Sequence, residues 1–150
     1  MSNWHISFFA AACVMAAAPG APAASETVIY AFQGGGDESA PAGPLLNVSG
    51  TLYGTTSSGG ANNAGTVFSV TPAGVKTVLH SFGGTGDGMQ PQGGLVKLGG
   101  FLYGTTYSGG AQGNGPRYKM SLAGVETVIY SFGYGGDVHN PQVGIIRKWA

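Results

Sequence analysis

A six-residue segment of the chain returns twice at intervals of fifty residues, and this repeat constrains the fold more than any other feature of the sequence. Residues 27–32 read TVIYAF, residues 77–82 read TVLHSF and residues 127–132 read TVIYSF. The same interval carries LYGTT at residues 52–56 onto LYGTT at residues 102–106. A regular period of this length indicates tandem units, each of which buries its apolar side chains against the next.

Turn residues divide each unit into four short segments with the composition of strands. The first two are expected at about residues 93–98 and 101–107, and the other two, clearer in the earlier copy, at residues 65–71 and 76–82. Each segment contains β-branched or aromatic residues, and turn-forming residues such as glycine separate them. The sequence therefore predicts one antiparallel four-stranded sheet per unit.

Four strands in a unit of about fifty residues are typical of a β-propeller blade. We expect an all-β chain with two full blades, a leading outer strand and a trailing inner strand, at residues 41–82, 91–132, 27–32 and 141–150 respectively. The first strand of each blade would lie innermost and the fourth outermost. A β-solenoid is the alternative fold, although its coils are usually shorter and more uniform.

The composition agrees with short strands and argues against a nucleic-acid partner. The 150 residues include 29 glycines, which suit tight turns and would weaken helices. Six Lys and Arg balance six Asp and Glu, so the chain lacks the basic surface that a phosphate backbone requires.

The amino terminus has the pattern of an export signal. Residues 6–18 read ISFFAAACVMAAA, an apolar run that is shorter than a membrane span. Small residues at Ala21 and Ala23 fit a cleavage site, so we predict a signal peptide at residues 1–23 and no membrane span in the mature chain. No Lys or Arg precedes the run, and a buried helix, a membrane anchor or a lipid on Cys13 are the alternatives. Cys13 is the single cysteine, so its removal leaves no disulfide.

The third strand of the second unit departs from the repeat. Residues 115–120 read GPRYKM where residues 65–70 read GTVFSV. Pro116 has no amide hydrogen to donate, and Arg117 stands at the position of Val67, which we expect to point inward. The sequence therefore predicts that this strand is frayed or lies at a sheet edge.

Several motifs in fixed order resemble a known family. The stretch LYGTTSSGGANNAGTVFSVTPAGVKTVLHSF is similar to the GloVer tandem repeat of exported bacterial proteins, whose unit runs through LYGTT, a glycine pair, GTVF and a TVLYSF-like strand. The resemblance covers residues 26–146. It implies a secreted or surface-attached, propeller-like repeat protein with no established activity, and it transfers no catalytic residue to this chain.

Two full blades are too few to close a propeller, since known closed propellers have at least four. The sequence stops at residue 150, where a further LYGTT strand is expected. We therefore expect self-association with other copies, an open stack, or further blades that are missing from this chain.

Candidate metal ligands are scattered. Glycine-rich loops contain the recurring residues Asp37, Asp87 and Asp137. Calcium takes six to eight oxygen ligands, so a turn-stabilising role is expected for each aspartate instead of a calcium-binding role. His80 replaces a tyrosine of the repeat and His139 lies in a loop, whereas zinc needs three or four ligands at one point. We predict no metal and no cofactor.

Hydroxyl and aromatic residues are the remaining candidates. The threonines of LYGTT recur in both units, with no serine elbow or base beside them, so we predict packing and no catalytic residue. Tyr53 and Tyr103 share one repeat position and are expected in the core. Tyr107 and Tyr134 have no aromatic counterpart in the preceding unit, which makes them the candidate ligand contacts, for example to sugar rings.

The sequence as a whole predicts a non-enzymatic exported tandem-repeat protein, a structural or interaction module at the cell surface or outside the cell. Another protein or a surface glycan is the expected partner. Two alternatives stay open: a fragment of a longer β-propeller protein without independent activity, or a propeller-type enzyme domain acting on polysaccharide. Such an enzyme should gather acids or histidines at one channel mouth.

Overall fold

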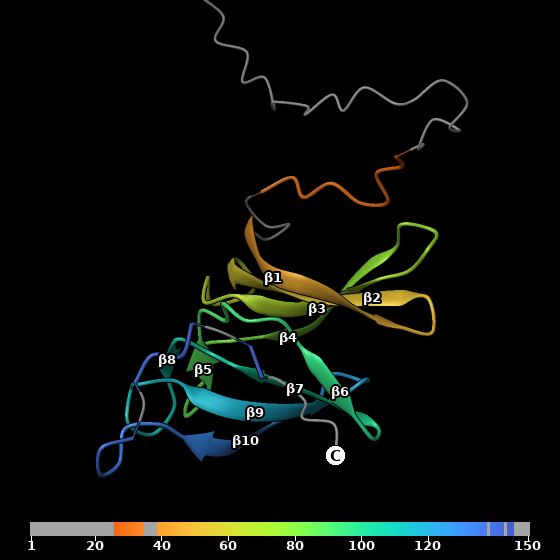
Figure 1. Cartoon of the computed structure of the whole chain (residues 1–150). Helices are drawn as coiled ribbons and strands as arrows, with labels where there is room; N and C mark the ends of the chain where they lie inside the picture. The colour runs from red at the N-terminus through yellow and green to blue at the C-terminus, as the bar shows by residue number, and fades with distance from the viewer. Residues whose placement is uncertain (1–25, 35–38, 138, 143, 146–150) are drawn as a thin grey trace, which may run out of the picture.

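The computed structural model of the chain describes residues 26–34, 39–137, 139–142 and 144–145. The predicted signal peptide, residues 1–23, lies outside this part of the chain. No helix within the described part is long and apolar enough to cross a membrane. Every named element is a β-strand, which confirms the all-β prediction (Figure 1).

Each repeat unit folds into one antiparallel four-stranded sheet. Sheet I holds, in spatial order, β1 (Ser39–Val48), β2 (Thr51–Ser58), β3 (Thr66–Val70) and β4 (Lys76–Ser81). Sheet II has the matching order β6 (Val96–Leu98), β7 (Phe101–Thr105), β9 (Pro116–Ser121) and β10 (Glu126–Ser131). A small antiparallel pair, β5 (Gly88–Met89) and β8 (Ser108–Gly109), lies beside them. The two large sheets lie one above the other in Figure 1.

Local turn chemistry explains the tight connection between β1 and β2. Two residues, Ser49 and Gly50, join the strands with φ angles of 51° and 89°. Positive φ at both central positions matches the twist of a two-residue hairpin, and glycine adopts it at little cost. The amide of Gly50 donates to Oδ1 of Asn47 at 2.9 Å, which holds the turn closed.

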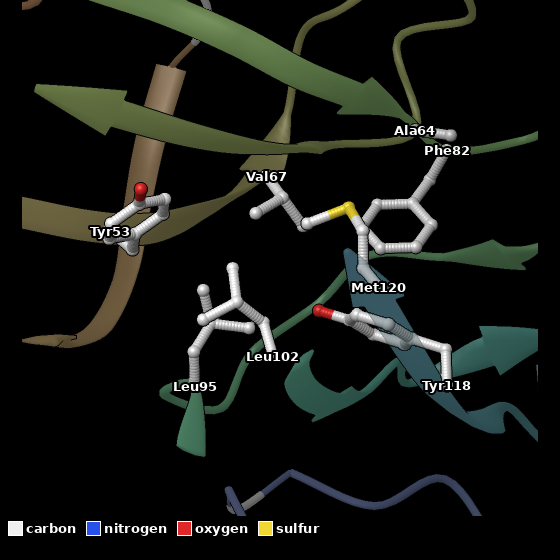
Figure 2. Packing of buried hydrophobic residues seen from close by; sticks show 8 residues of the cluster. All are labelled: Tyr53, Ala64, Val67, Phe82, Leu95, Leu102, Tyr118 and Met120. Carbon is white, nitrogen blue, oxygen red and sulfur yellow. The ribbon is translucent and has the colours of Figure 1, made fainter. Parts of the chain in front are cut away.

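The hydrophobic core lies between the two sheets. Val67 of sheet I lies near Leu102 and Met120 of sheet II, with Tyr53 on one side of this cluster and Phe82 on the other (Figure 2). Because these side chains are almost fully shielded from water, each contributes on the order of 1.5–3 kcal/mol of transfer free energy. The two units therefore share one core.

The contacts that join a unit to the residues before it recur at equivalent positions. Residues 26–34 pack on sheet I, where the ring of Phe32 meets Phe68 at 5.2 Å. The ring of Phe82 meets Tyr118 of sheet II at the same distance. We call the face of each sheet that receives these earlier residues its near face, and the opposite face its far face. The far face of sheet I is thus covered by the near face of sheet II.

Glycine in the LYGTT motif makes room for these aromatic rings. A Cβ on Gly104 would lie 2.4 Å from the hydroxyl of Tyr118, and a Cβ on Gly54 would lie 2.6 Å from Cζ of Phe68. Such distances are far inside van der Waals contact, so the ring of the third strand needs a glycine beneath it on the second strand. The repeated glycine is therefore a packing requirement.

The first segments of successive units also approach closely. A Cβ on Gly43 would meet the amide nitrogen of Gly94 at 2.6 Å, and a Cβ on Gly144 would meet the carbonyl oxygen of Gly94 at 2.8 Å. Side chains at these positions would push the backbones apart. Three successive copies of the repeat are thus in backbone contact along this line.

The prediction of a frayed or edge third strand in the second unit is wrong. Strand β9 lies in the interior of sheet II and pairs with both β7 and β10. Pro116 is tolerated because it is the first residue of the strand. The side chain of Arg117 is exposed on the far face of sheet II, whereas its counterpart Val67 is fully buried on the far face of sheet I.

The two partial strands need a second correction. Residues 27–32 are not assigned to a strand, although they cover the near face of sheet I as predicted for an outer segment. Residues 141–142 and 144–145 are likewise irregular, and residues 146–150 lie outside the described part. A strand requires a hydrogen-bonded ladder with a neighbouring strand, and among the described residues neither segment belongs to a sheet.

Candidate functional site

Three side chains with metal-ligand chemistry meet at the boundary between the two units. His80 comes from β4, Asp87 from the loop that follows it, and Glu126 from the first position of β10. One nitrogen or oxygen atom from each lies within 4.8 Å of the other two. We call these residues the boundary triad.

The local structure holds His80 and Asp87 in place. Nε2 of His80 and Oδ2 of Asp87 are 3.0 Å apart, and the imidazole packs edge-on against Phe82 with a centroid distance of 4.8 Å. The other oxygen of Asp87 accepts a hydrogen bond from the amide of Gly88 at 2.6 Å. The side chains of His80 and Asp87 are only 22% and 10% exposed, so water screens their interaction weakly.

Glu126 is the electrostatically unusual member of the triad. Its Oε1 atom is buried and has no hydrogen-bond partner. Burial raises the pKa of Glu126 above its ordinary value, the negative charge of Asp87 raises it further, and His80 acts in the opposite direction. The negative charge of Glu126 is therefore only partly compensated, by His80.

A tyrosine of the core adds a second buried polar atom near the two carboxylates. The hydroxyl of Tyr118 is buried without a hydrogen-bond partner. Burial, followed by the charges of Glu126 and Asp87, raises the pKa of Tyr118 beyond the ordinary range. Tyr118 therefore stays neutral and is unsuited to act as a base.

The equivalent place at the first boundary has the opposite chemistry. Lys76, the counterpart of Glu126, lies with Nζ 5.4 Å from the ring centre of Tyr30 and 5.1 Å from that of Phe32. Tyr30 is in turn the counterpart of His80. A cation on an aromatic pair at one boundary is thus replaced by an acid beside an imidazole at the other.

The recurring loop aspartates reach back to the outer strand. Asp87 contacts His80, and Asp137 accepts a hydrogen bond from the hydroxyl of Tyr130 at 2.5 Å. Asp37 lies outside the described part of the chain. Asp87 also accepts from the next amide, so its role extends beyond the turn to the neighbouring strand.

The structure does not bring the two candidate tyrosines into one site. Tyr107 is half-buried, and its carbonyl accepts a hydrogen bond from the Asn140 side chain at 2.9 Å. Tyr134 is 57% exposed, and its hydroxyl accepts from Gln112 at 2.8 Å. No ring contact joins the two tyrosines in the described part, and His139 is exposed on the adjoining loop.

The threonine hydroxyls of LYGTT are used in internal hydrogen bonds. Oγ1 of Thr55 lies 2.7 Å from the carbonyl oxygen of Ala42 and 3.2 Å from that of Gly93, so it connects the two units. Oγ1 of Thr56 lies 2.9 Å from that of Thr66. These side chains are buried and have no adjacent base, so their geometry is that of packing residues.

An apolar cavity of about 310 Å³ lies between residues 26–34 and the near face of sheet I. Its wall includes Tyr30, Leu45, Leu52 and Phe68, and none of the described residues that line it is charged. The described lining contains no acid, imidazole or thiol.

The prediction from the sequence considered His80 and Asp87 separately and did not include Glu126. A usable signal was present, because two positions change together between the copies: Tyr30 becomes His80, and Lys76 becomes Glu126. Residues that touch across a boundary are expected to change as pairs. Only the sheet packing shows that these two positions are in contact.

Two four-stranded antiparallel sheets of equal topology, joined by recurring contacts, define an all-β tandem-repeat protein. The Gloeobacter/Verrucomicrobia repeat matches residues 17–149. The chain belongs to this family, as the GloVer resemblance predicted. Comparisons with curated proteins and with solved structures gave no match.

Proposed function

We propose that the chain is an exported, non-enzymatic tandem-repeat module whose units stack as blades of a β-propeller type. Its role would be structural or interactive, at the cell surface or outside the cell. The observation that carries the stacking is the recurrence of boundary contacts: Phe32 meets Phe68 as Phe82 meets Tyr118. A turn glycine also makes the same contact in both units: Gly74 lies against Ile29, and Gly124 lies against Leu79.

The far face of sheet II supports the interaction role. Phe101 and Leu98 are 41% and 54% exposed there, and Nζ of Lys119 lies 5.3 Å from the ring centre of Phe101. On sheet I the equivalent face is covered by the next unit. A further unit of the same repeat, in the same protein or in another copy, is therefore the occupant that fits this face.

The contacts of the repeated motif residues support a structural role. Thr55 and Thr106 donate to backbone carbonyls, and Gly54 and Gly104 make room for the rings of Phe68 and Tyr118. Tyr107 and Tyr134 remain the proposed contacts for a glycan or protein partner.

Light scattering after size-exclusion chromatography, with circular dichroism on the same peak, tests the stacking. The exported chain should give a β-rich spectrum and a defined oligomer in which open sheet faces are covered. A folded monomer, unchanged across a wide range of concentration, would contradict stacking between copies. Turnover of a polysaccharide substrate by the purified protein would contradict the non-enzymatic role.

Amino-terminal sequencing tests export. Protein recovered from the periplasm or the medium should begin near residue 24, and chain retained in the cytoplasm with Met1 intact would contradict the proposal. A glycan array with the wild-type chain and a Tyr107→Ala, Tyr134→Ala double variant tests the ligand contacts. Binding that the double variant loses would support them, and binding that it keeps would exclude them.

A further inference from the structure

The boundary triad has a geometry that a single metal ion can use. Its three ligand atoms come from three separate segments and lie within 4.8 Å of one another. Zinc holds nitrogen and oxygen ligands at about 2.0–2.2 Å, which places neighbouring ligand atoms of a tetrahedral site about 3.3–3.6 Å apart. Side-chain rotations that move the ligand atoms by about an ångström would bring the three atoms to these separations.

The charges at the site favour a cation. Two carboxylates, Asp87 and Glu126, face one imidazole, and Oε1 of Glu126 is buried without a hydrogen-bond partner. The cationic side chain of Lys119 lies on the opposite face of sheet II, over Phe101. A divalent ion would satisfy the buried oxygen and neutralise both acids.

Comparison with the first boundary leads to the same conclusion independently. There, a positive charge occupies the equivalent position, because Nζ of Lys76 lies over Tyr30 and Phe32. At the second boundary this built-in cation is lost, since Glu126 replaces Lys76, and a metal-ligating imidazole replaces the Tyr30 phenol. Both substitutions change the site in the direction of metal binding.

We propose that His80, Asp87 and Glu126 form a binding site for a divalent transition-metal ion, with zinc as the best fit, between the two repeat units. One nitrogen and two oxygens are a ligand set that zinc takes readily, whereas calcium and magnesium prefer oxygen alone. Water would complete the coordination. The ion would connect β4 and its following loop to β10, and so fasten one unit to the next.

Such an ion would stabilise the fold, because it binds the assembled boundary and not the unfolded chain. At a zinc concentration a hundredfold above Kd, we expect Tm to rise by about 5–10 °C for a domain of this size. Calcium and magnesium at the same concentration should change Tm by much less.

The experiment uses the full chain with Cys13→Ser, which removes the only thiol, after treatment with a chelator and dialysis. Titration calorimetry with zinc should show one ion bound per chain, and thermal unfolding should show the rise in Tm. Zinc binding too weak to detect at millimolar concentration, or a Tm that zinc leaves unchanged, would overturn the proposal.

The first boundary supplies a matched control. The double variant His80→Tyr, Glu126→Lys copies the pair found at Tyr30 and Lys76, so it should fold while losing the response to zinc. Glu126→Gln keeps the size of the side chain and should weaken zinc binding at least tenfold. His139→Ala, which changes an exposed histidine outside the triad, should bind zinc as the parent does.

Two results would overturn the assignment even if zinc binds. One is binding that survives in both the double variant and Glu126→Gln. The other is binding that His139→Ala abolishes, which would place the ion on the adjoining loop. If the double variant is unfolded by circular dichroism, the comparison of Glu126→Gln with His139→Ala decides the question.

Discussion

The two repeat units have the same topology but different patterns of burial. All five residues of β3 in the first unit are buried, whereas β9 in the second unit alternates between buried and more exposed positions. Sheet I is covered on its near face by residues 26–34 and on its far face by sheet II, whereas no further four-stranded sheet in the described part of the chain covers the far face of sheet II. Burial in this protein is therefore set by the neighbouring layer as well as by the strand itself.

Side chains on the third strand follow this difference. On the near faces, Phe68 is matched by Tyr118, and both are buried. On the far faces, Val67 is matched by Arg117, and only Val67 is buried. The second unit has apolar residues on the face that a described neighbour covers, and it carries the charge of Arg117 on the face that no described sheet covers.

The largest expected effect comes from exchanging the residues of the two far faces. Val67→Arg would place an unpaired charge in the core and should lower the free energy of unfolding by about 3–5 kcal/mol. Arg117→Val changes an exposed position and should alter it by about 0.5 kcal/mol or less. Urea denaturation followed by circular dichroism measures both. Equal losses would show that the two far faces are equally covered.

Aromatic truncation at the ends of the fourth strands is the next test. Phe82 is fully buried between the sheets, so Phe82→Ala should cost about 3–4 kcal/mol of unfolding free energy. Its counterpart Phe132 is only half-buried, and Phe132→Ala should cost about 1 kcal/mol. A similar cost at both positions would mean that Phe132 is covered by another layer, as in an oligomer, and dilution would then reduce its effect.

A hydroxyl exchange sharpens the comparison of the near faces. Tyr118→Phe removes a buried hydroxyl that has no partner and should raise the free energy of unfolding by about 1 kcal/mol. Phe68→Tyr adds such a hydroxyl at the equivalent position and should lower it by about 1–2 kcal/mol. Chemical denaturation of both variants beside the parent gives the signs. Destabilisation by Tyr118→Phe would reveal a hydrogen bond of that hydroxyl in solution.

The smallest effect concerns the exposed end of the second unit. The pKa of Tyr130 is raised above its ordinary value, chiefly by the hydrogen bond to Asp137 and then by burial. A group with a raised pKa in the folded state contributes stability below its unfolded pKa, and this contribution is lost as the pH rises through the folded pKa. In an NMR titration of ring-labelled tyrosine, Asp137→Asn should lower the pKa of Tyr130. An unchanged value would show that the hydrogen bond does not persist in solution.

Most of the secondary structure was predictable because each local sequence pattern appears in both copies of the repeat. Turn residues that appear twice at the same offset are hard to misread, and β4 was expected at residues 76–82 and found at Lys76–Ser81. The prediction for Pro116 was wrong because proline, which has no amide hydrogen to donate, disturbs the interior of a strand but not its first position. Strand β9 starts at that residue, so proline is tolerated there.

The boundary triad was harder to predict from the sequence, for a different reason. Its members are separated by up to 46 positions, and only the packing of sheet I on sheet II brings them together. From the sequence, His80 was interpreted as a substitute for the repeat tyrosine and Asp87 as a turn residue. Each interpretation accounts for part of the contacts of that residue. Their meeting with Glu126 is a property of the boundary, which no single strand pattern encodes.

Tandem copies of one sequence face a difficulty during folding, because an element of one copy can dock on the counterpart of another. The two boundaries of this chain carry different polar partners, Lys76 with Tyr30 and Glu126 with His80. In a swapped arrangement, Glu126 would face the electron-rich ring of Tyr30, and the contact of Lys76 with the rings of Tyr30 and Phe32 would be lost. We therefore expect the different polar residues at the two junctions to favour one docking order of the units over its permutation.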